Sequence, residues 1–275
     1  MLDVNIKIFV SDICHILFHI RIAKLHVYNS KSKNLHFRCF GKTFFCQLSV
    51  TSLQPNIGLG ESADKKGCKT FTKVEGLFNI VEVAAGLRHA VAVDKDGRAW
   101  GWGAAGKGQI GYEASGGKLL KAPKIFGPAE AVRGVSCGQY FTLLTTETKM
   151  VEGHGDNKHG QLDASSHSVP YHQISCGWTH AVVLQDNVVG GWGRNNYHQL
   201  GGNKLGGVKK IATGSEHCLA LTSQNQVLAW GWNEHGNCGQ DGEDDVETPT
   251  LVKGLEGKIT TDIFSGSAHS FAIIE

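Results

Sequence analysis

Residues 81–111 read VEVAAGLRHAVAVDKDGRAWGWGAAGKGQIG, and this stretch decides the fold of the chain. It contains a G-x-x-H motif, a short run of small and apolar residues, an Asp-Gly turn, a Trp-Gly pair and a closing G-Q-I-G. The same features return downstream in the same order. The chain is therefore a repeat protein, and its function has to be inferred at the level of the repeat.

The spacing of the repeats indicates their architecture. The first glycine of the motif, the anchor glycine, recurs at intervals of 52, 39, 37 and 52 residues. Periods of this length, with the variation confined to connecting segments, are typical of a propeller or a solenoid. The anchor glycines are Gly86, Gly138, Gly177, Gly214 and Gly266, and the residues three positions after them are His89, Phe141, His180, His217 and His269.

Local periodicity indicates β-structure in the repeats. Each of the first four anchor glycines is followed by a short apolar and β-branched run, a turn signal and a second short run. Asp96-Gly97 is the clearest turn, Asp186-Asn187 and Gln224-Asn225 tolerate positive φ, and residues 146–148 give the weakest signal. No segment keeps a 3.6-residue period over three turns, so we expect an all-β fold of small antiparallel sheets.

The first 53 residues differ from the rest of the chain. Only Gly41 of the 36 glycines lies among the first 50 residues, and none of the six tryptophans does. The apolar stretch at 8–22 is too interrupted by polar side chains for a membrane span or a signal peptide. We expect residues 1–53 to be a non-repetitive extension or a gene-model artefact. We expect residues 54–275 to be propeller repeats, with units near 81–134, 135–173, 174–210 and 211–262 and a half unit at 263–275.

Charge and cysteine content narrow the functional classes. The chain has 27 Lys and Arg against 25 Asp and Glu, a net charge of +2, which gives no strong signal for nucleic acid or an anionic membrane. None of the eight cysteines forms a C-x-x-C pair or has zinc-finger spacing. Cys137 and Cys176 stand where Ala85 stands in the first unit, so we expect buried thiols in a reducing compartment. That favours the cytoplasm, with the nucleus as a second location.

Two sequence patterns typical of phosphate-binding loops occur within the first repeat unit. Residues 101–106 satisfy G-x-G-x-x-G, and residues 101–108 come within one residue of a P-loop. Both motifs need a following helix to direct backbone N–H groups at phosphate. The aligned segments 194–198 and 233–236 have no such pattern, so we interpret the stretch as a propeller loop.

Metal and acid–base sites are not expected either. The repeated histidines occupy one slot in different blades, so ring symmetry keeps them apart, and Phe141 replaces one of them. We expect each imidazole to be buried and to bond backbone within its own blade. The acidic stretch 241–247 lacks the alternating oxygen ligands and closing bidentate Glu of a calcium-binding loop, so we interpret it as a solvated loop. We therefore expect no catalytic residue, cofactor or metal.

The order of motifs resembles the repeat of the regulator of chromosome condensation family over about residues 54–275. Members of that family are seven-bladed β-propellers, which implies the same fold here. Several strings, above all WGWNEHG at 230–236, are similar to family members that act as guanine nucleotide exchange factors in secretion. Four units and two fragments fall short of seven, so we expect a partial propeller of about four to five recognisable blades.

The resemblance implies a protein-interaction function. The expected partner is a small GTPase or a component of an exocytosis complex, bound either to promote nucleotide exchange or as a scaffold; a scaffold without exchange activity and a chromatin-associated propeller are the alternatives. The founding member of the family uses a projecting wedge, for which the longest candidates here are 112–131 and 240–261. Arg and Trp are common at interfaces, although the tryptophans could equally pack between blades. The candidate contact residues are Trp178, Arg194, Asn195, Trp232, Asn233 and Glu234.

Overall fold

The computed structural model describes residues 74–111, 119–148, 150–163, 171–202 and 204–275. It also gives the backbone of five strands before residue 74, namely β1 (Lys7–Val10), β2 (Lys24–Asn29), β3 (Leu35–Arg38), β4 (Ser49–Ser52) and β5 (Cys68–Lys73). The nature expected for residues 1–53, as an extension or an artefact, rests on segments that lie mostly outside the described residues.

From residue 74 onward, the described residues form five antiparallel sheets and no helix. We call the sheets blades A to E. Blade A contains β6 (Ile80–Ala85), β7 (His89–Asp94), β8 (Ala99–Ala104) and β9 (Leu119–Phe126), and blade B contains β10 (Val132–Cys137), β11 (Phe141–Thr146) and β12 (Val151–Gly155). Blade C contains β13 (Gln173–Cys176), β14 (His180–Gln185) and β15 (Val188–Gly193). Blade D contains β16 (Val208–Thr213), β17 (His217–Thr222), β18 (Val227–Gly231) and β19 (Val246–Leu251), and blade E contains β20 (Thr260–Ser265) and β21 (Ser270–Ile274).

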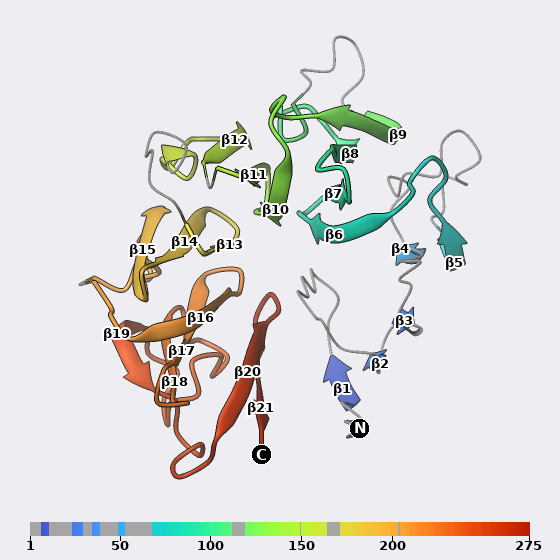
Figure 1. Ribbon diagram of the computed structural model, residues 1–275. Helices are drawn as coiled ribbons and strands as arrows, with labels where there is room; N and C mark the ends of the chain where they lie inside the picture. The colour runs from blue at the N-terminus through green and yellow to red at the C-terminus, as the bar shows by residue number, and fades with distance from the viewer. Residues whose placement is uncertain are drawn as a thin grey trace.

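The blades follow one another around a common centre (Figure 1). The first strand of each blade is innermost, and each innermost strand lies beside that of the next blade, from β6 through β10, β13 and β16 to β20. This arrangement confirms the all-β class and the partial propeller expected from the repeats.

The repeat boundaries inferred from sequence need a small shift. Boundaries near 134, 210 and 262 cut through the innermost strands β10, β16 and β20. The residues just before an anchor glycine belong to the innermost strand of the same blade. The units placed at 135, 211 and 263 therefore begin three residues earlier, and those placed at 81 and 174 begin one residue earlier.

The hairpin turns follow the residue types expected from the sequence. Asp186, Asn187 and Asn225 adopt positive φ (48°, 64° and 64°), as expected from their tolerance of the left-handed region. The weakest turn signal still closes a hairpin, because the backbone N–H of Thr146 donates to the carbonyl of Met150 at 2.9 Å.

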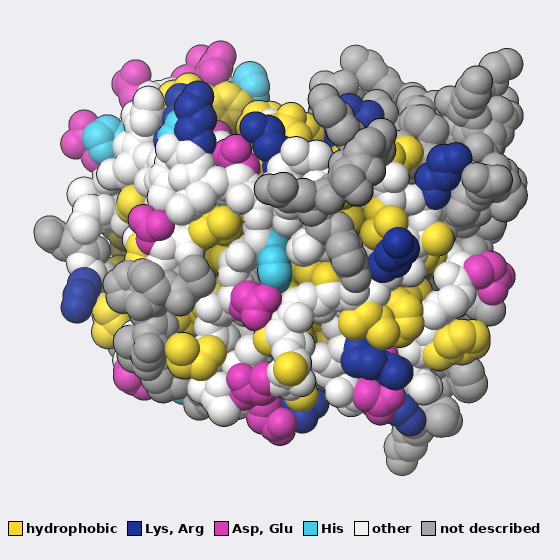
Figure 2. All heavy atoms as spheres, turned by 90° about the horizontal axis from the view of Figure 1, so that it is seen from above, with side chains coloured by type: hydrophobic (Ala, Val, Ile, Leu, Met, Phe, Trp, Pro, Cys, Tyr) yellow, Lys and Arg dark blue, Asp and Glu magenta, His cyan; other side chains and the backbone are white. Residues whose placement is uncertain are grey.

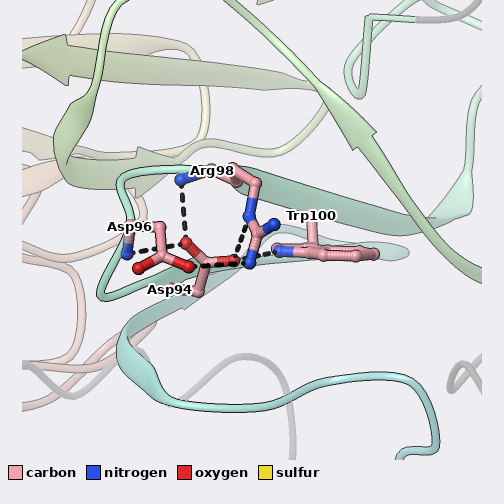
Figure 3. A network of polar contacts seen from close by, with 4 residues as sticks. All are labelled: Asp94, Asp96, Arg98 and Trp100. Atoms are coloured by element: carbon pink, nitrogen blue, oxygen red, sulfur yellow. Dashed lines mark hydrogen bonds and ion pairs between the residues drawn. The ribbon is translucent and has the colours of Figure 1, made fainter.

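The turn of blade A is held by a buried carboxylate (Figure 3). Asp94 is only 2% exposed and accepts hydrogen bonds from the backbone N–H groups of Asp96 and Arg98, from Arg98 Nε and from Trp100 Nε1, at 2.8 to 3.0 Å. Burial alone would raise the pKa of Asp94, but the bonds from Trp100 and Arg98 and the Arg98 charge lower the pKa below its ordinary value. Thr146 and Thr222 occupy the same slot and accept the backbone N–H groups of Met150 and Gln226, so this position caps the turn.

Four of the hydrophobic clusters among the described residues lie at junctions between blades. Trp230 is 1% exposed and packs in one cluster with residues of blade C such as Val182. Its Nε1 donates to the backbone carbonyl of Gln199, also in blade C, at 2.8 Å. Trp192 packs in the same way against a cluster that spans blades B and C, so both tryptophans fill the space between neighbouring blades.

The long segments that follow the Trp-Gly pairs of blades A and D (Trp102-Gly103 and Trp230-Gly231) contribute outer strands. Residues 119–126 form β9, and residues 246–251 form β19. Pro123 and Pro249 lie in these edge strands, where a missing N–H limits further pairing. Blade strands therefore take up part of both wedge candidates, 112–131 and 240–261, and residues 112–118 lie outside the described residues.

Candidate interaction face

One face of the propeller gathers all of the G-x-x-H loops and the loops after Trp-Gly, because β7 starts where β8 ends. The same holds in blades B, C and D. We call this surface the loop face. It consists of residues 86–89, 138–141, 177–180, 214–217 and 266–269 around the centre, and residues 104–111, 156–163, 194–201 and 232–239 further out.

A belt of backbone hydrogen bonds joins the inner loops. In each case the residue after the anchor glycine donates its N–H to the carbonyl of the equivalent residue in the next blade, at 2.8 to 3.2 Å. The glycines and their neighbours line the central depression. Because the belt uses these N–H groups, they are not available to bind an anion. The belt runs through Leu87, Gln139, Trp178, Ser215 and Ser267.

The anchor glycine is required by the ring three residues later. A Cβ on Gly86 would lie 2.2 Å from His89 Cε1, and a Cβ on Gly138 would lie 1.9 Å from Phe141 Cε1. Each ring therefore packs on the Cα of its own anchor glycine. This contact explains why the motif keeps both positions together.

The buried histidines bond the next blade. His89 Nε2 lies 3.0 Å from Thr142 Oγ1 in blade B, and that hydroxyl donates to the carbonyl of Gln109 in blade A at 2.7 Å. Because the hydroxyl proton is used there, the imidazole carries its proton on Nε2 and donates. The expectation that these rings bond backbone within their own blade is wrong, since the polar partner belongs to the following repeat.

The same arrangement recurs twice more. His180 Nε2 lies 3.3 Å from Cys218 Sγ. His217 Nε2 lies 3.0 Å from Ser270 Oγ and 2.9 Å from Ser265 Oγ, both in blade E. The Cys218 thiol and the Ser270 hydroxyl donate in turn to carbonyls of the preceding blade, those of Gln199 at 3.2 Å and Asn237 at 2.6 Å. His269, in blade E, stacks on Phe271 with ring centroids 6.4 Å apart.

Burial fixes the protonation states of these groups. It lowers the pKa of His180 to about 3 and that of His217 to about 4, with smaller contributions from the neighbouring His217 and His269. Burial raises the pKa of Cys137 to about 12 and also raises that of Cys176. Neutral imidazoles and protonated thiols suit a structural role, and the described residues contain no group of three possible metal ligands.

Amide side chains shape the outer loops. Gln199 is buried, and its Oε1 accepts the backbone N–H of Tyr197 at 2.9 Å; Gln109 and Gln161 make the same contact in their loops. Asn195 Oδ1 accepts the N–H of Leu200 at 2.9 Å. The Gln of the G-Q-I-G motif is therefore a scaffold for the loop.

One predicted contact residue has an internal role. Asn233 is 0% exposed, its Oδ1 accepts the N–H of Cys238, and its Nδ2 donates to the carbonyls of Gly242 and Asp244. Its assignment as a surface contact is wrong, because the whole amide is used to fix the acidic loop at 240–245 against the Trp-Gly loop. The sequence position of Asn233 indicated a loop but not the direction of its side chain.

The remaining predicted contact residues lie on the loop face of blades C and D. The Arg194 guanidinium lies over the Tyr197 ring, 5.5 Å from its centroid, and Trp178 is half-buried in the belt. Trp232 Nε1 donates to Glu234 Oε2 at 3.2 Å. Asn195 and Glu234 are exposed. The structure thus gives the loop face of blades C and D an exposed or half-exposed set of aromatic and charged side chains.

Glu216 adds a charge that sequence reasoning missed. It is 7% exposed and accepts hydrogen bonds from Gln199 Nε2 and, at 3.5 Å, from Thr179 Oγ1, both in blade C. Burial raises the pKa of this carboxyl, while the Gln199 bond and the Arg194 charge oppose the rise. No motif marks this residue; its position before the histidine in G-x-x-H is the only signal, and that position also holds Arg88 and Tyr140.

The near P-loop has no phosphate-binding geometry. Gly101 and Gly103 lie in β8, and a Cβ on Gly101 would lie 2.8 Å from Ile110 Cβ. No helix follows the stretch among the described residues. The glycines serve close packing. The interpretation of the stretch as a propeller loop is wrong up to Ala104, because these residues belong to β8.

Charge is mixed over the surface. Figure 2 shows basic, acidic and hydrophobic side chains interspersed on one side of the molecule, with no continuous field of one sign. An ion pair of Lys107 Nζ with Asp156 Oδ1, 3.5 Å apart, links blades A and B on the loop face. No helix among the described residues is long and apolar enough to cross a membrane.

Comparison with known proteins agrees with the repeat geometry. The regulator of chromosome condensation (RCC1) repeat matches residues 224–273, and a second description of the same repeat matches residues 80–109. The chain belongs to the RCC1 repeat family. It is 30% identical over 227 residues to the ultraviolet-B receptor UVR8 of Arabidopsis thaliana, which covers 72% of this chain and 51% of the receptor. It is also 30% identical over 251 residues to the mouse secretion-regulating guanine nucleotide exchange factor, covering 71% of this chain and 54% of that factor.

Solved RCC1 structures share the fold. The structure of Prp20p from Saccharomyces cerevisiae, described with its binding to Gsp1p and histones, has a TM-score of 0.69 at 20% identity and covers 90% of this chain and 67% of its own. Human WBSCR16 has a TM-score of 0.67 at 19% identity, covering 78% and 63%. This RCC1 chain thus spans about half the length of the two sequence relatives and about two thirds of the two structural ones.

Proposed function

We propose that this chain is a protein-interaction propeller whose loop face binds a small GTPase or a component of an exocytosis complex, in the cytoplasm and also in the nucleus. Binding would either promote release of guanine nucleotide or hold the GTPase in a complex. Exchange needs no covalent chemistry, because a partner that prefers the nucleotide-free state lowers nucleotide affinity by differential binding.

The observation that carries the proposal is the side-chain set on the loop face of blades C and D. Arg194 over Tyr197, together with the half-buried Trp178 and Trp232, combines the residue types that dominate protein interfaces. The bases of these side chains are fixed by the backbone belt and by the Gln199 scaffold. A rigid aromatic and arginine surface loses little conformational entropy on binding.

The names of relatives favour a GTPase as the partner. One relative is a secretion-regulating guanine nucleotide exchange factor, and the solved Prp20p structure is described with binding to Gsp1p. These activities belong to those proteins, and their transfer to a chain that covers part of their length is the proposal.

A nucleotide-release assay tests exchange. A panel of small GTPases loaded with fluorescent GDP is mixed with the full chain, and we expect faster release from at least one of them. R194A should reduce the acceleration, whereas R133A should not, because Arg133 pairs with Glu147 at the hairpin end of blade B, away from the loop face. No acceleration by saturating chain would exclude exchange.

A scaffold without exchange activity is the second candidate. The longest inserts form the outer strands β9 and β19, so the described residues offer no long projecting wedge. Binding of a GTPase without faster nucleotide release would identify this case. Chromatin binding is third, because the charge is balanced; failure to bind nucleosomes at low as well as high salt would remove it.

A further inference from the structure

Two sequence positions, which we call slots, vary together across the four blade junctions. The first slot is the residue three positions after the anchor glycine, such as His89 in blade A. The second slot lies in the next blade, one residue after its own ring position, such as Thr142 in blade B. Imidazoles face Thr142, Cys218 or Ser270 at three junctions, and His217 also faces the hydroxyl of Ser265 on the following blade. At the junction of blades B and C, the ring is Phe141 and the second slot holds Ala181.

The apolar pair occupies the same place as the polar ones. Phe141 and Ala181 are both 0% exposed and belong to one core cluster. Phe141 packs on Gly138 as His89 packs on Gly86. The exchange of His for Phe is therefore a substitution inside a fixed geometry.

Physical chemistry explains why the slots change together. A buried imidazole Nε2–H needs an acceptor, and Thr142, Cys218 and Ser270 supply one while passing their own proton to a carbonyl of the preceding blade. A phenyl ring has no proton to donate and extends further than imidazole, so it needs a small apolar neighbour. Each mismatched pair would leave a buried donor unpaired or would crowd the junction.

We propose that these two slots form an inter-blade pairing code, in which an imidazole requires a hydroxyl or thiol on the following blade and a phenyl ring requires alanine. The code makes the junction of blades B and C chemically distinct from its neighbours. In a chain of similar repeats, such a mismatch penalty disfavours packing in the wrong order and exchange of blades between chains.

Reciprocal double-mutant cycles in the full chain test the code. In the first cycle, F141H and A181T should each lower the urea midpoint, and F141H/A181T should recover at least half of the summed loss. In the second cycle, H89F and T142A should each lower the urea midpoint. The double variant H89F/T142A should lose less stability than the sum of the two single losses. The control pair H89F/A181T joins different junctions and should be additive.

The outcomes separate the code from simple packing. A double variant that folds where a single variant does not also supports the code. Additive doubles in both cycles, or a single variant as stable as the wild type, would overturn it. A nuclear magnetic resonance spectrum of F141H/A181T should show the introduced imidazole as the Nε2–H tautomer; the Nδ1–H tautomer would contradict the proposed bond.

Discussion

Gln199 in blade C donates a hydrogen bond from Nε2 to the carboxylate of Glu216 in blade D, where Glu216 is 7% exposed. The other end of the same amide accepts the N–H of Tyr197, whose ring lies under Arg194. One buried contact between blades is thus connected to the surface that we propose binds a partner.

Truncation of this carboxyl should destabilise the junction. E216A leaves the Gln199 Nε2–H group without its acceptor, which should cost about 1–3 kcal/mol in the free energy of unfolding. E216Q keeps the size and an acceptor oxygen and should cost less. Urea unfolding at pH 7 measures both variants, and equal losses would argue against the hydrogen bond as the cause.

The same pair has a predictable pH dependence. The pKa of Glu216 is raised in the folded state, so its contribution to stability is fully present below the unfolded value near 4.5 and is lost as pH rises through the folded pKa. As pH rises from the unfolded to the folded pKa of Glu216, the wild type should therefore lose stability relative to E216Q, which carries no titrating carboxyl at this position. Urea midpoints measured from pH 4 to pH 8 give the pH dependence of stability for both proteins. If the two curves run parallel, Glu216 does not titrate with a raised pKa in the folded chain.

The buried histidines predict acid sensitivity of the opposite sign. Their pKa values are lowered to about 3 and about 4, so the folded chain binds fewer protons than the unfolded chain below the ordinary value of 6.5. Stability is present above pH 6.5 and falls as pH decreases toward 4, by on the order of 3 kcal/mol for each histidine. H217F should unfold with a shallower acid dependence than the wild type. An unchanged slope would show that His217 is not the titrating group.

Asn237 offers a stabilising substitution. It occupies the slot of Gln109, Gln161 and Gln199, but it is one methylene shorter, and its buried Oδ1 has no partner among the described residues. N237Q should let the amide oxygen accept the N–H of His235 and raise the free energy of unfolding by about 1 kcal/mol. N237A is the matched control and should lower it. A loss of stability in N237Q would mean that the loop of blade D has no room for the longer amide.

Removal of the Asp94 carboxylate should weaken blade A. The carboxylate accepts four hydrogen bonds that close the turn between β7 and β8. We expect D94A to cost about 2 kcal/mol, and D94T, which copies the slot in blades B and D, to recover part of the loss. Thermal unfolding of the two variants checks the order, and equal midpoints would contradict the capping role.

The sequence predicted the blades because their landmarks recur in one order, and the turns at Asp186-Asn187 and Asn225 follow from residue type. It could not predict the histidine partners, because Thr142 lies 53 residues from His89 and is brought close only by the ring. Asn233 was misassigned because loop position does not show side-chain direction. Glu216 was missed because a single buried carboxyl between blades has no motif.

The central claim is that the loop face of blades C and D is a binding surface. The most direct measurement is the affinity of the full chain for nucleotide-free small GTPases immobilised on a sensor surface, compared among the wild type, R194A, W178A and R133A. We predict that R194A and W178A each weaken binding about tenfold or more, while R133A stays within about twofold of the wild type. Equal affinities of all four proteins, or a loss confined to R133A, would contradict the claim.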